Sequence, residues 1–292
     1  MAGFFGLFNY EKEGPGISKN APKKKTFIVF FETYFRNFWK FVIINIVYGI
    51  LSLPLITGGL ASVGITNVNR NIARDKHSFG LSDFFDTIKK NWKQGLIAGI
   101  INTIVYILLL FDVYFFITMK SKMSTIFVGV AFCLLLIFTM MNYFIWTLMI
   151  TFKFSIKQIY KNSFKFAFIN LKGNFICFFS LMLVYVLFVA LIFLLKRFWL
   201  YVILIELLIF VLFFPCFKYL LIQFCVFPSI KKYLIDPYYR DNPDVDIEKR
   251  RDLGIEIEED EKEDGEEELQ EGENTTEEDD DDDDDDGVIF TD

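Results

Sequence analysis

The sequence predicts an all-α polytopic membrane protein: six transmembrane helices in three hairpins, a cytoplasmic interfacial helix before each hairpin, and a disordered acidic C-terminal tail. Two observations predict this class. Of the 292 residues, 53% are hydrophobic, and long stretches are almost free of charge. Each approaches or exceeds the ~18–20 residues that cross the hydrocarbon core of a bilayer. These stretches are 94–111, 124–152, 173–195 and 198–217.

The net charge of −7 combines a basic body with an acidic tail. Residues 251–292 contain 24 acidic and 2 basic residues, whereas residues 1–250 contain 13 acidic and 28 basic residues. The tail includes eight consecutive aspartates at 279–286 and too few apolar residues to form a core of its own. We therefore expect the body to bind the lipid bilayer, the tail to stay in water, and no nucleic-acid partner.

Hydropathy divides the chain into three parts. Residues 1–25 are expected to form a cytoplasmic N-terminal segment, residues 26–235 a helical membrane domain, and residues 236–292 an acidic, largely disordered cytoplasmic tail. One segment of the membrane domain is weak by hydropathy because it contains Asn67 and Arg70. The predicted spans are about 38–56, 58–72, 94–118, 124–148, 173–195 and 198–222.

The distribution of basic residues supports counting the weak segment 58–72 as a return span. With this span included, the lysine-rich loops 70–93 and 153–172 lie on the same side as Lys23–Lys25. By the positive-inside rule this side is the cytoplasm, so both termini are cytoplasmic. The other side receives two very short loops, whose basic residues are Lys120, Lys122, Lys196 and Arg197.

An internal repeat precedes each outward-going span. A phenylalanine is followed six residues later by Asn37, Asn91 or Asn170, and each asparagine is predicted to mark the bend into the membrane. The first two preceding helices are amphipathic and are expected to lie at the interface with their aromatic faces in the lipid. Those faces carry Phe27, Phe30, Phe31, Tyr34, Phe35 and Phe38 in the first, and Phe84, Phe85, Ile88 and Trp92 in the second.

The stretch "SLPLITGGLASVG" at 52–64 breaks an apolar run. Its helix-breaking residues are Pro54, Thr57, Gly58 and Gly59, and they predict a structural turn at the outer end of the first hairpin. The alternative is a discontinuous helix that presents its terminus to a solute.

Polar residues inside the spans are the remaining candidates for function. Asp112 and Glu206 are carboxylates within predicted spans, and such groups are costly in hydrocarbon. Solute or ion handling, structural pairing and simple exposure at the interface all remain open for them. We expect Asn45, Asn67, Asn102 and Asn142 to act as hydrogen-bond partners between helices rather than as a binding site.

Lysines recur every four residues after the fourth span, at Lys153, Lys157, Lys161 and Lys165. This spacing places them on one stripe of a helix that continues the span. We expect the stripe to face anionic lipid headgroups or the acidic tail.

Signals of catalysis are missing from the sequence. His77 is the single histidine, and no nucleotide-binding, esterase or zinc-protease motif occurs. The four cysteines have no metal-site spacing and are expected to be packing residues. We therefore expect a protein that is not an enzyme and has no metal or cofactor.

The first 115 residues resemble the YesL-like (DUF624) family of bacterial membrane proteins. The stretch "RNIARDKHSFGLSDFFDTIKKNWKQ" at 70–94 carries part of the resemblance. The resemblance implies a multi-pass protein of the bacterial plasma membrane, often encoded near carbohydrate ABC-transporter and sensor genes, and it supplies no reaction. The other matching positions are Asn45, Pro54, Thr57, Gly59, Asp83 and Phe84.

Two functions follow as expectations. The first is a non-catalytic membrane accessory or regulatory protein that assists a membrane transporter or sensor, such as a carbohydrate ABC transporter. The alternative is a small-solute or ion transporter that uses the polar residues of its spans.

Overall fold

The computed structural model describes residues 25–119, 121 and 123–241, and this part of the chain is helical. The first 24 residues and the acidic tail from residue 242 lie outside it, as do Lys120 and Lys122, so expectations about them stay predictions. The helices are α1 Thr26–Arg36, α2 Phe38–Ser52, α3 Gly58–Ala73, α4 Leu81–Thr118, α5 Ser124–Thr151, α6 Ile156–Ile169, α7 Leu171–Leu194, α8 Trp199–Ile230 and α9 Asp236–Asp241. A 3₁₀ turn, Lys196–Phe198, joins α7 to α8, and a π-helical turn, Lys231–Ile235, joins α8 to α9.

Four helical segments among the described residues are long and apolar enough to cross a membrane. They are α4, α5, α7 and the continuous helix Leu200–Arg240. The first pair of helices is shorter: α2 has 15 residues and α3 has 16. At 1.5 Å per residue each is about 22–24 Å long, less than the ~30 Å hydrocarbon core. Length therefore supports four of the six predicted spans.

The chain bends at each of the three repeated asparagines. The backbone angles φ and ψ are −104° and 16° at Asn37, −115° and 18° at Asn91, and −101° and 37° at Asn170. The side chains of Asn37 and Asn91 each donate to the carbonyl four residues earlier, at 3.0 and 3.1 Å. These side-chain bonds tie each asparagine to the helix that precedes the bend. The side chain of Asn170 instead donates to the Cys225 carbonyl on α8 at 3.0 Å, so this bend is fixed by a contact between helices.

The aromatic face of α1 is divided between the protein and its surroundings, which corrects the expectation that it lies wholly in lipid. Phe30 is only 4% exposed, and its ring packs edge-on against Phe217 and Phe224 of α8 at 5.2 and 5.6 Å. Phe27 and Phe35 remain exposed. The inner half of this face packs on α8 because aromatic edge-to-face contacts there add to the buried area.

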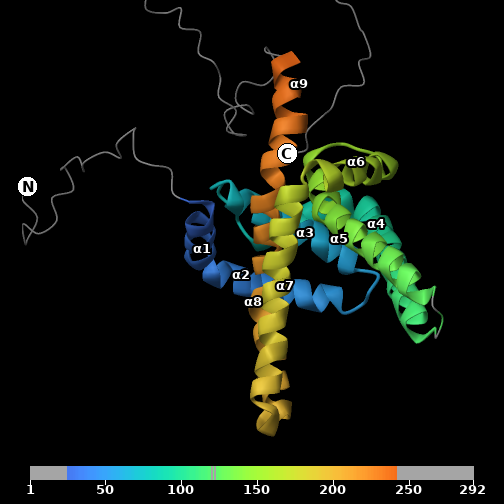
Figure 1. The fold of residues 1–292 in the computed structure, drawn as a ribbon. Coiled ribbons are helices and arrows are strands. Elements are labelled where there is room, and N and C mark those ends of the chain that lie inside the picture. The colour runs from blue at the N-terminus through green and yellow to red at the C-terminus, as the bar shows by residue number, and fades with distance from the viewer. Residues whose placement is uncertain (1–24, 120, 122, 242–292) are drawn as a thin grey trace, which may run out of the picture.

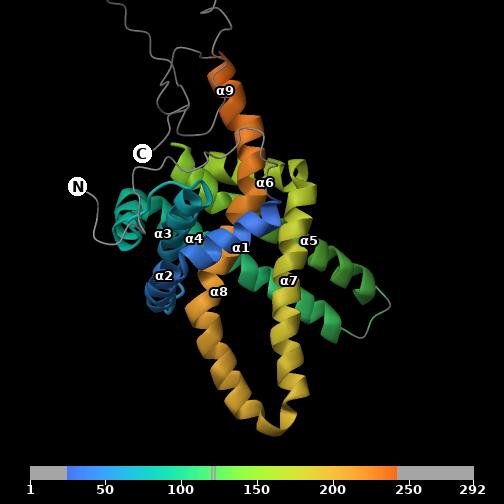
Figure 2. The same ribbon diagram turned by 90° about the vertical axis from the view of Figure 1, so that its left-hand side faces the viewer.

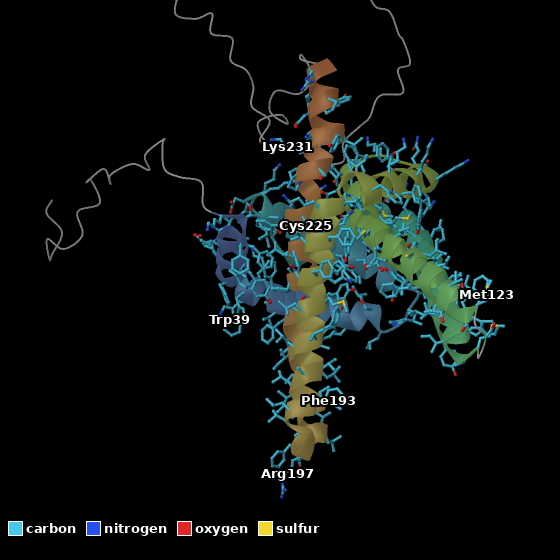
Figure 3. The ribbon with its side chains drawn as sticks, in the orientation of Figure 1. Trp39, Met123, Phe193, Arg197, Cys225 and Lys231 are labelled. Atoms are coloured by element: carbon cyan, nitrogen blue, oxygen red, sulfur yellow. The ribbon has the colours of Figure 1, made fainter. Side chains whose placement is uncertain are left out.

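The helix pairs are not parallel. Figure 1 shows α7 and α8 along the long axis of the molecule, with α4 and α5 inclined to them and α2 lying across α8. Figure 2 shows that the α7–α8 pair extends alone toward its connecting turn, while α6 lies at the opposite end of the molecule. In Figure 3 that turn, marked by Arg197, lies farther along the axis than Met123 at the end of the α4–α5 pair.

Glycines allow α3 and α4 to touch backbone to backbone. A Cβ atom on Gly59 would lie 2.3 Å from the carbonyl oxygen of Gly95 and 2.5 Å from the Cα of Gly99. Small residues four apart are the usual way for membrane helices to approach closely, and Gly95 and Gly99 have this spacing. Gly58 is different, because a Cβ there would meet nothing within 4 Å.

The turn of the first pair occupies residues 53–57, as the sequence predicts, but its glycines are not turn residues. Gly58 and Gly59 are the first two residues of α3, and neither has a positive φ. The chain reverses between Pro54 and Thr57, where the backbone N–H of Thr57 donates to the Pro54 carbonyl at 2.9 Å. The two glycines thus begin a helix, and Gly59 allows that helix to pack closely against α4.

The side chain of Asn45 on α2 forms hydrogen bonds to α8 beside Pro215. Its Nδ2 donates to the carbonyl of Leu212 at 2.7 Å, and its Oδ1 accepts from the backbone N–H of Cys216 at 2.8 Å. An uninterrupted helix would pair these two backbone groups with each other. Pro215 lies between them, and a proline inside a helix disrupts the preceding turn. Asn45 is fully buried, and its amide is a partner for both of these backbone groups of α8.

Replacing Asn45 with alanine should lower the free energy of unfolding by about 2–4 kcal/mol, because two buried backbone groups lose their partners at about 1–3 kcal/mol each. Adding Pro215→Ala should cost less than the sum of the two single effects, since a proline-free α8 can pair residues 216 and 212 directly. Thermal unfolding of the four proteins in detergent measures this coupling. Strictly additive effects would contradict the bridge.

The two adjacent glycines of α3 form a matched pair for a second test. Gly59→Ala should lower the free energy of unfolding by about 1–3 kcal/mol, because its Cβ collides with the backbone of α4. Gly58→Ala should change it by less than about 0.5 kcal/mol, since its Cβ points into open space. Denaturant titration of both variants checks the difference. Equal losses would mean that the glycines act through the turn.

Candidate functional site between the helix pairs

A cavity of about 710 Å³ lies among α2, α3, α4, α5, α7 and α8. Its volume is within the range of ~300–1,000 Å³ that is typical of small-molecule sites. Gly58 and Gly59 are at its edge, so the close crossing of α3 and α4 forms one wall. Much of the remaining wall is apolar, from Trp146, Phe178, Leu181, Met182, Val186 and Ile222.

Two asparagines connect the α4 and α5 walls of the cavity. Nδ2 of Asn102 donates to Oδ1 of Asn142 at 2.9 Å, and the hydroxyl of Tyr160 on α6 donates to Oδ1 of Asn102 at 2.7 Å. Asn142 in turn donates to the carbonyl of Phe138 at 3.1 Å. This chain of hydrogen bonds satisfies the amides and holds them at the cavity surface.

A second polar group lies on the α3 and α8 side. The hydroxyl of Tyr219 donates to Oγ of Ser62 at 2.8 Å, and the ring of Tyr48 meets that of Tyr219 edge-on at 5.9 Å. Oγ of Ser52 is buried and has no hydrogen-bond partner among the described residues. A buried hydroxyl without a partner is uncommon. It is therefore available to a bound molecule.

Lys218 is the one charged side chain among the described residues that line the cavity. It lies in the apolar helix α8, where it is half-buried, and its Nζ is 5.5 Å from the centre of the Tyr219 ring. Aspartate and glutamate do not occur in the described lining. An ionisable residue within an apolar helix marks a functional candidate. This lysine gives the cavity a local positive charge.

This combination of side chains can bind a small polar molecule. Tyrosine hydroxyls, amides and aromatic rings suit a hydroxylated molecule, and the ammonium suits a single anionic group. Among the described lining residues the polar groups are hydroxyls, amides and one lysine. Among the described residues no group of three or more metal-ligating side chains is found.

The structure brings only part of the predicted candidates to this cavity. Gly58 and Gly59 line it, and Pro54 and Thr57 form the adjacent turn. Asn45 bridges α8, as described above. Asn67 donates from Nδ2 to the hydroxyl of Thr87 on α4 at 2.7 Å, so it ties α3 to α4.

Neither predicted carboxylate lines the cavity. Asp112 is exposed near the C-terminal end of α4. Glu206 lies on α8 near the α7–α8 turn, where it is 9% exposed and its Oε1 has no partner among the described residues. The cavity-lining part of α8 begins at Lys218, more than three helical turns away.

The lysine stripe does not continue the fourth span, which corrects that expectation. Helix α5 ends at Thr151, residues Phe152 to Ser155 are not helical, and α6 begins anew. A capping box between Ser155 and Gln158 begins α6, because it satisfies the free N–H groups of the first turn. Lys157, Lys161 and Lys165 are exposed on α6, and Lys153 is exposed before it.

Sequence reasoning missed Lys218 and the tyrosines around it. A signal was present, since Lys218 is the single charge between residues 207 and 230. The charge-free stretch 198–217 ends just before it, and the predicted span 198–222 contains it without giving it a role. The tyrosines come from separate helices, and only the fold brings them together.

The fold and its apolar helices define a helical membrane protein with a cavity between its helix pairs. Residues 41–113 match the family described as "Protein of unknown function, DUF624". This match confirms the resemblance to the DUF624 family and covers most of α2, all of α3 and most of α4. No curated protein and no solved structure matches the chain.

Proposed function

We propose that the protein is a non-catalytic integral membrane accessory or regulatory protein that binds a small carbohydrate in the central cavity. The observation that carries the proposal is a cavity of ligand size with aromatic walls, fixed hydrogen-bonding groups and one lysine. Aromatic faces and amide or hydroxyl groups together suit a sugar ring, and Lys218 favours a sugar that carries a carboxylate. A carbohydrate ABC transporter or a sensor of the bacterial plasma membrane is the proposed partner.

A small-solute or ion transporter is the second candidate. The same cavity supports it, because several helix pairs contribute to its wall and their rearrangement could expose it to either side. Ion-coupled transport commonly uses carboxylates near the substrate, and the described lining contains none. Binding without transport is therefore the better-supported function.

We propose that the α2–α3 pair enters the membrane and returns without crossing it. Its turn is apolar and exposed: Leu53 is 80% and Leu55 is 69% exposed. The other two turns contain charged residues, with Lys120 and Lys122 in one and Arg197 in the other. An apolar turn suits lipid, whereas a charged turn suits water. A re-entrant pair keeps the basic loops on one side just as two full spans would, so both termini remain cytoplasmic in this proposal.

Cysteine labelling with a membrane-impermeant reagent tests the topology. Single cysteines at positions 80 and 161 should react from the cytoplasmic side and at 121 and 197 from the outside, whereas position 55 should react from neither. Reaction of position 55 from outside would instead show two full spans. The unmodified chain, whose four native cysteines lie in α5, α7 and α8, provides the background. Outside labelling of position 80 would overturn the return of α3.

Ligand binding is tested by the melting temperature of the purified protein in detergent. Glucuronate should raise it more than glucose, and Lys218→Met should abolish that difference, because the substitution keeps the length of the side chain and removes its charge. Lys161→Met, on the exposed face of α6, is the matched control. An absence of any shift with both sugars would contradict the carbohydrate ligand.

Flux separates the two candidate functions. Proteoliposomes with wild-type protein should accumulate no more labelled glucuronate than empty vesicles if the protein is an accessory protein. Saturable uptake that is lost in Lys218→Met would instead establish a transporter.

A further inference from the structure

Arg70 lies on α3 and Arg74 is the C-terminal cap of that helix, and both line a cavity beside α8. Arg70 and Arg74 are four residues apart, which places them on one face of the helix. Arg70 donates from Nη1 to the Ile150 carbonyl and to the Thr151 hydroxyl, both at 3.0 Å, and from Nη2 to Oδ1 of Asn67 at 2.8 Å. Its Nε is buried and has no partner among the described residues.

Arg74 is much less satisfied than Arg70. Its guanidinium carbon lies 3.7 Å from the centre of the Phe227 ring on α8. Its Nε and Nη2 are buried and have no hydrogen-bond partner among the described residues. Beside it, Oε1 of Gln223 also lacks a partner, while Nε2 of that residue donates to Thr147 at 2.8 Å.

These groups surround a separate cavity of about 150 Å³. Its remaining wall is mainly apolar, from Ala73, Phe224, Phe227 and Pro228. No aspartate or glutamate is present in the described lining. Two cations therefore share a small, largely apolar cavity without an anion.

This arrangement is costly unless an anion completes it. Burying a charge without a partner costs several kcal/mol, and two like charges repel each other in addition. Burial, together with the positive charge of Arg70, lowers the pKa of Arg74 to about 8. A bound anion would remove both causes, since it offsets the lost hydration and the repulsion.

We propose that the Arg70–Arg74 cavity binds the phosphate group of a membrane phospholipid. Guanidinium groups present planar pairs of N–H donors that match phosphate oxygens, and the free donors of Arg74 include such a pair. The apolar wall would contact the glycerol and the first methylenes of the lipid. The site extends the function proposed above but does not depend on the central cavity or its ligand.

The position of the site favours a lipid as the source of the phosphate. Gln223, Phe227 and Pro228 belong to the part of α8 around Cys225 and before Lys231, which lies well away from Arg197 (Figure 3). Helix α6, which carries Lys157, Lys161 and Lys165, also lies away from the α7–α8 turn (Figure 1), on the side where the proposed topology places the cytoplasmic headgroups. Phe27, next to the lining residue Thr26, is exposed and can enter the same layer.

The acidic tail is a weaker occupant on chemical grounds. Residues 251–292 contain 24 acidic residues, so a carboxylate that entered the cavity would bring neighbouring charges against phenylalanine rings. Those neighbouring carboxylates would lose hydration without gaining a cation.

The test compares melting temperatures of the full-length protein in a neutral maltoside detergent. Phosphatidylglycerol should raise the wild-type value by about 5 °C, whereas diacylglycerol, which lacks phosphate, and equimolar inorganic phosphate should not. Arg74→Gln should remove this rise, and Lys161→Gln, which loses the same charge on exposed α6, should keep it. Without lipid, Arg74→Gln should melt no lower than wild type, because it no longer buries an unpaired charge.

Each other outcome would overturn the proposal. An equal rise with inorganic phosphate would identify a free anion as the ligand, and a rise that appears only after residues 242–292 are removed would identify the tail. An undiminished rise in Arg74→Gln would place the lipid elsewhere. A variant that melts lower with and without lipid would show a purely structural role for Arg74. If Arg74→Gln fails to fold, native mass spectrometry of Phe227→Leu and wild type should show less retained phospholipid in the variant, and equal retention would contradict the site.

Discussion

The amide of Asn45 is the interaction on which much of this architecture depends. Helix α8 packs against α1, α2, α3, α5 and α7, so its course positions every other pair. Pro215 in the middle of that helix has no N–H to donate, and the Leu212 carbonyl and the Cys216 N–H beside it lie in an apolar region where water cannot supply partners. Asn45 fits both groups with one side chain. These two hydrogen bonds to α8 fix how α2 crosses it. The hydroxyl of Tyr34 donates to the Phe213 carbonyl at 3.0 Å and adds a further contact to the same part of α8.

The central cavity follows from an uneven distribution of side-chain size. At Gly59, Gly95 and Gly99 the backbones of α3 and α4 touch, and the two helices stay in contact as far as Asn67 and Thr87. The larger aromatic and amide side chains of the other helices around the cavity do not fill the space. The Asn102–Asn142 bond joins α4 to α5 at the cavity wall. The small residues of the α3–α4 crossing thus form one closely packed wall of a cavity that larger side chains leave open.

Charge in the apolar region is distributed differently from the sequence expectation. Asp112 and Glu206 attracted attention because they interrupt apolar runs, yet one is exposed and the other lies near a turn. The cations Lys218, Arg70 and Arg74 lie where helices converge, each beside an aromatic ring or a cavity. What distinguishes these three from the two carboxylates is that each lines a cavity between helices, and this is a property of the fold.

Local features of this protein were determined by the sequence alone. Helix ends, the bends at Asn37, Asn91 and Asn170, the reversal after Ser52 and the membrane class depend on neighbouring residues and on hydropathy, so most boundaries could be predicted within four residues. Helix α8 is the exception, because it continues to Ile230, eight residues beyond the predicted span 198–222. The restart of the chain at Ser155 was also encoded locally, in a capping box that the lysine periodicity concealed. The contacts between helices were decided only by the tertiary structure. Gly59 packs against Gly95, and Asn45 bonds to α8 beside Pro215. Lys218 and five tyrosines line one cavity. These contacts join residues far apart in the chain, and their energies depend on crossing angles and shapes that no local pattern contains.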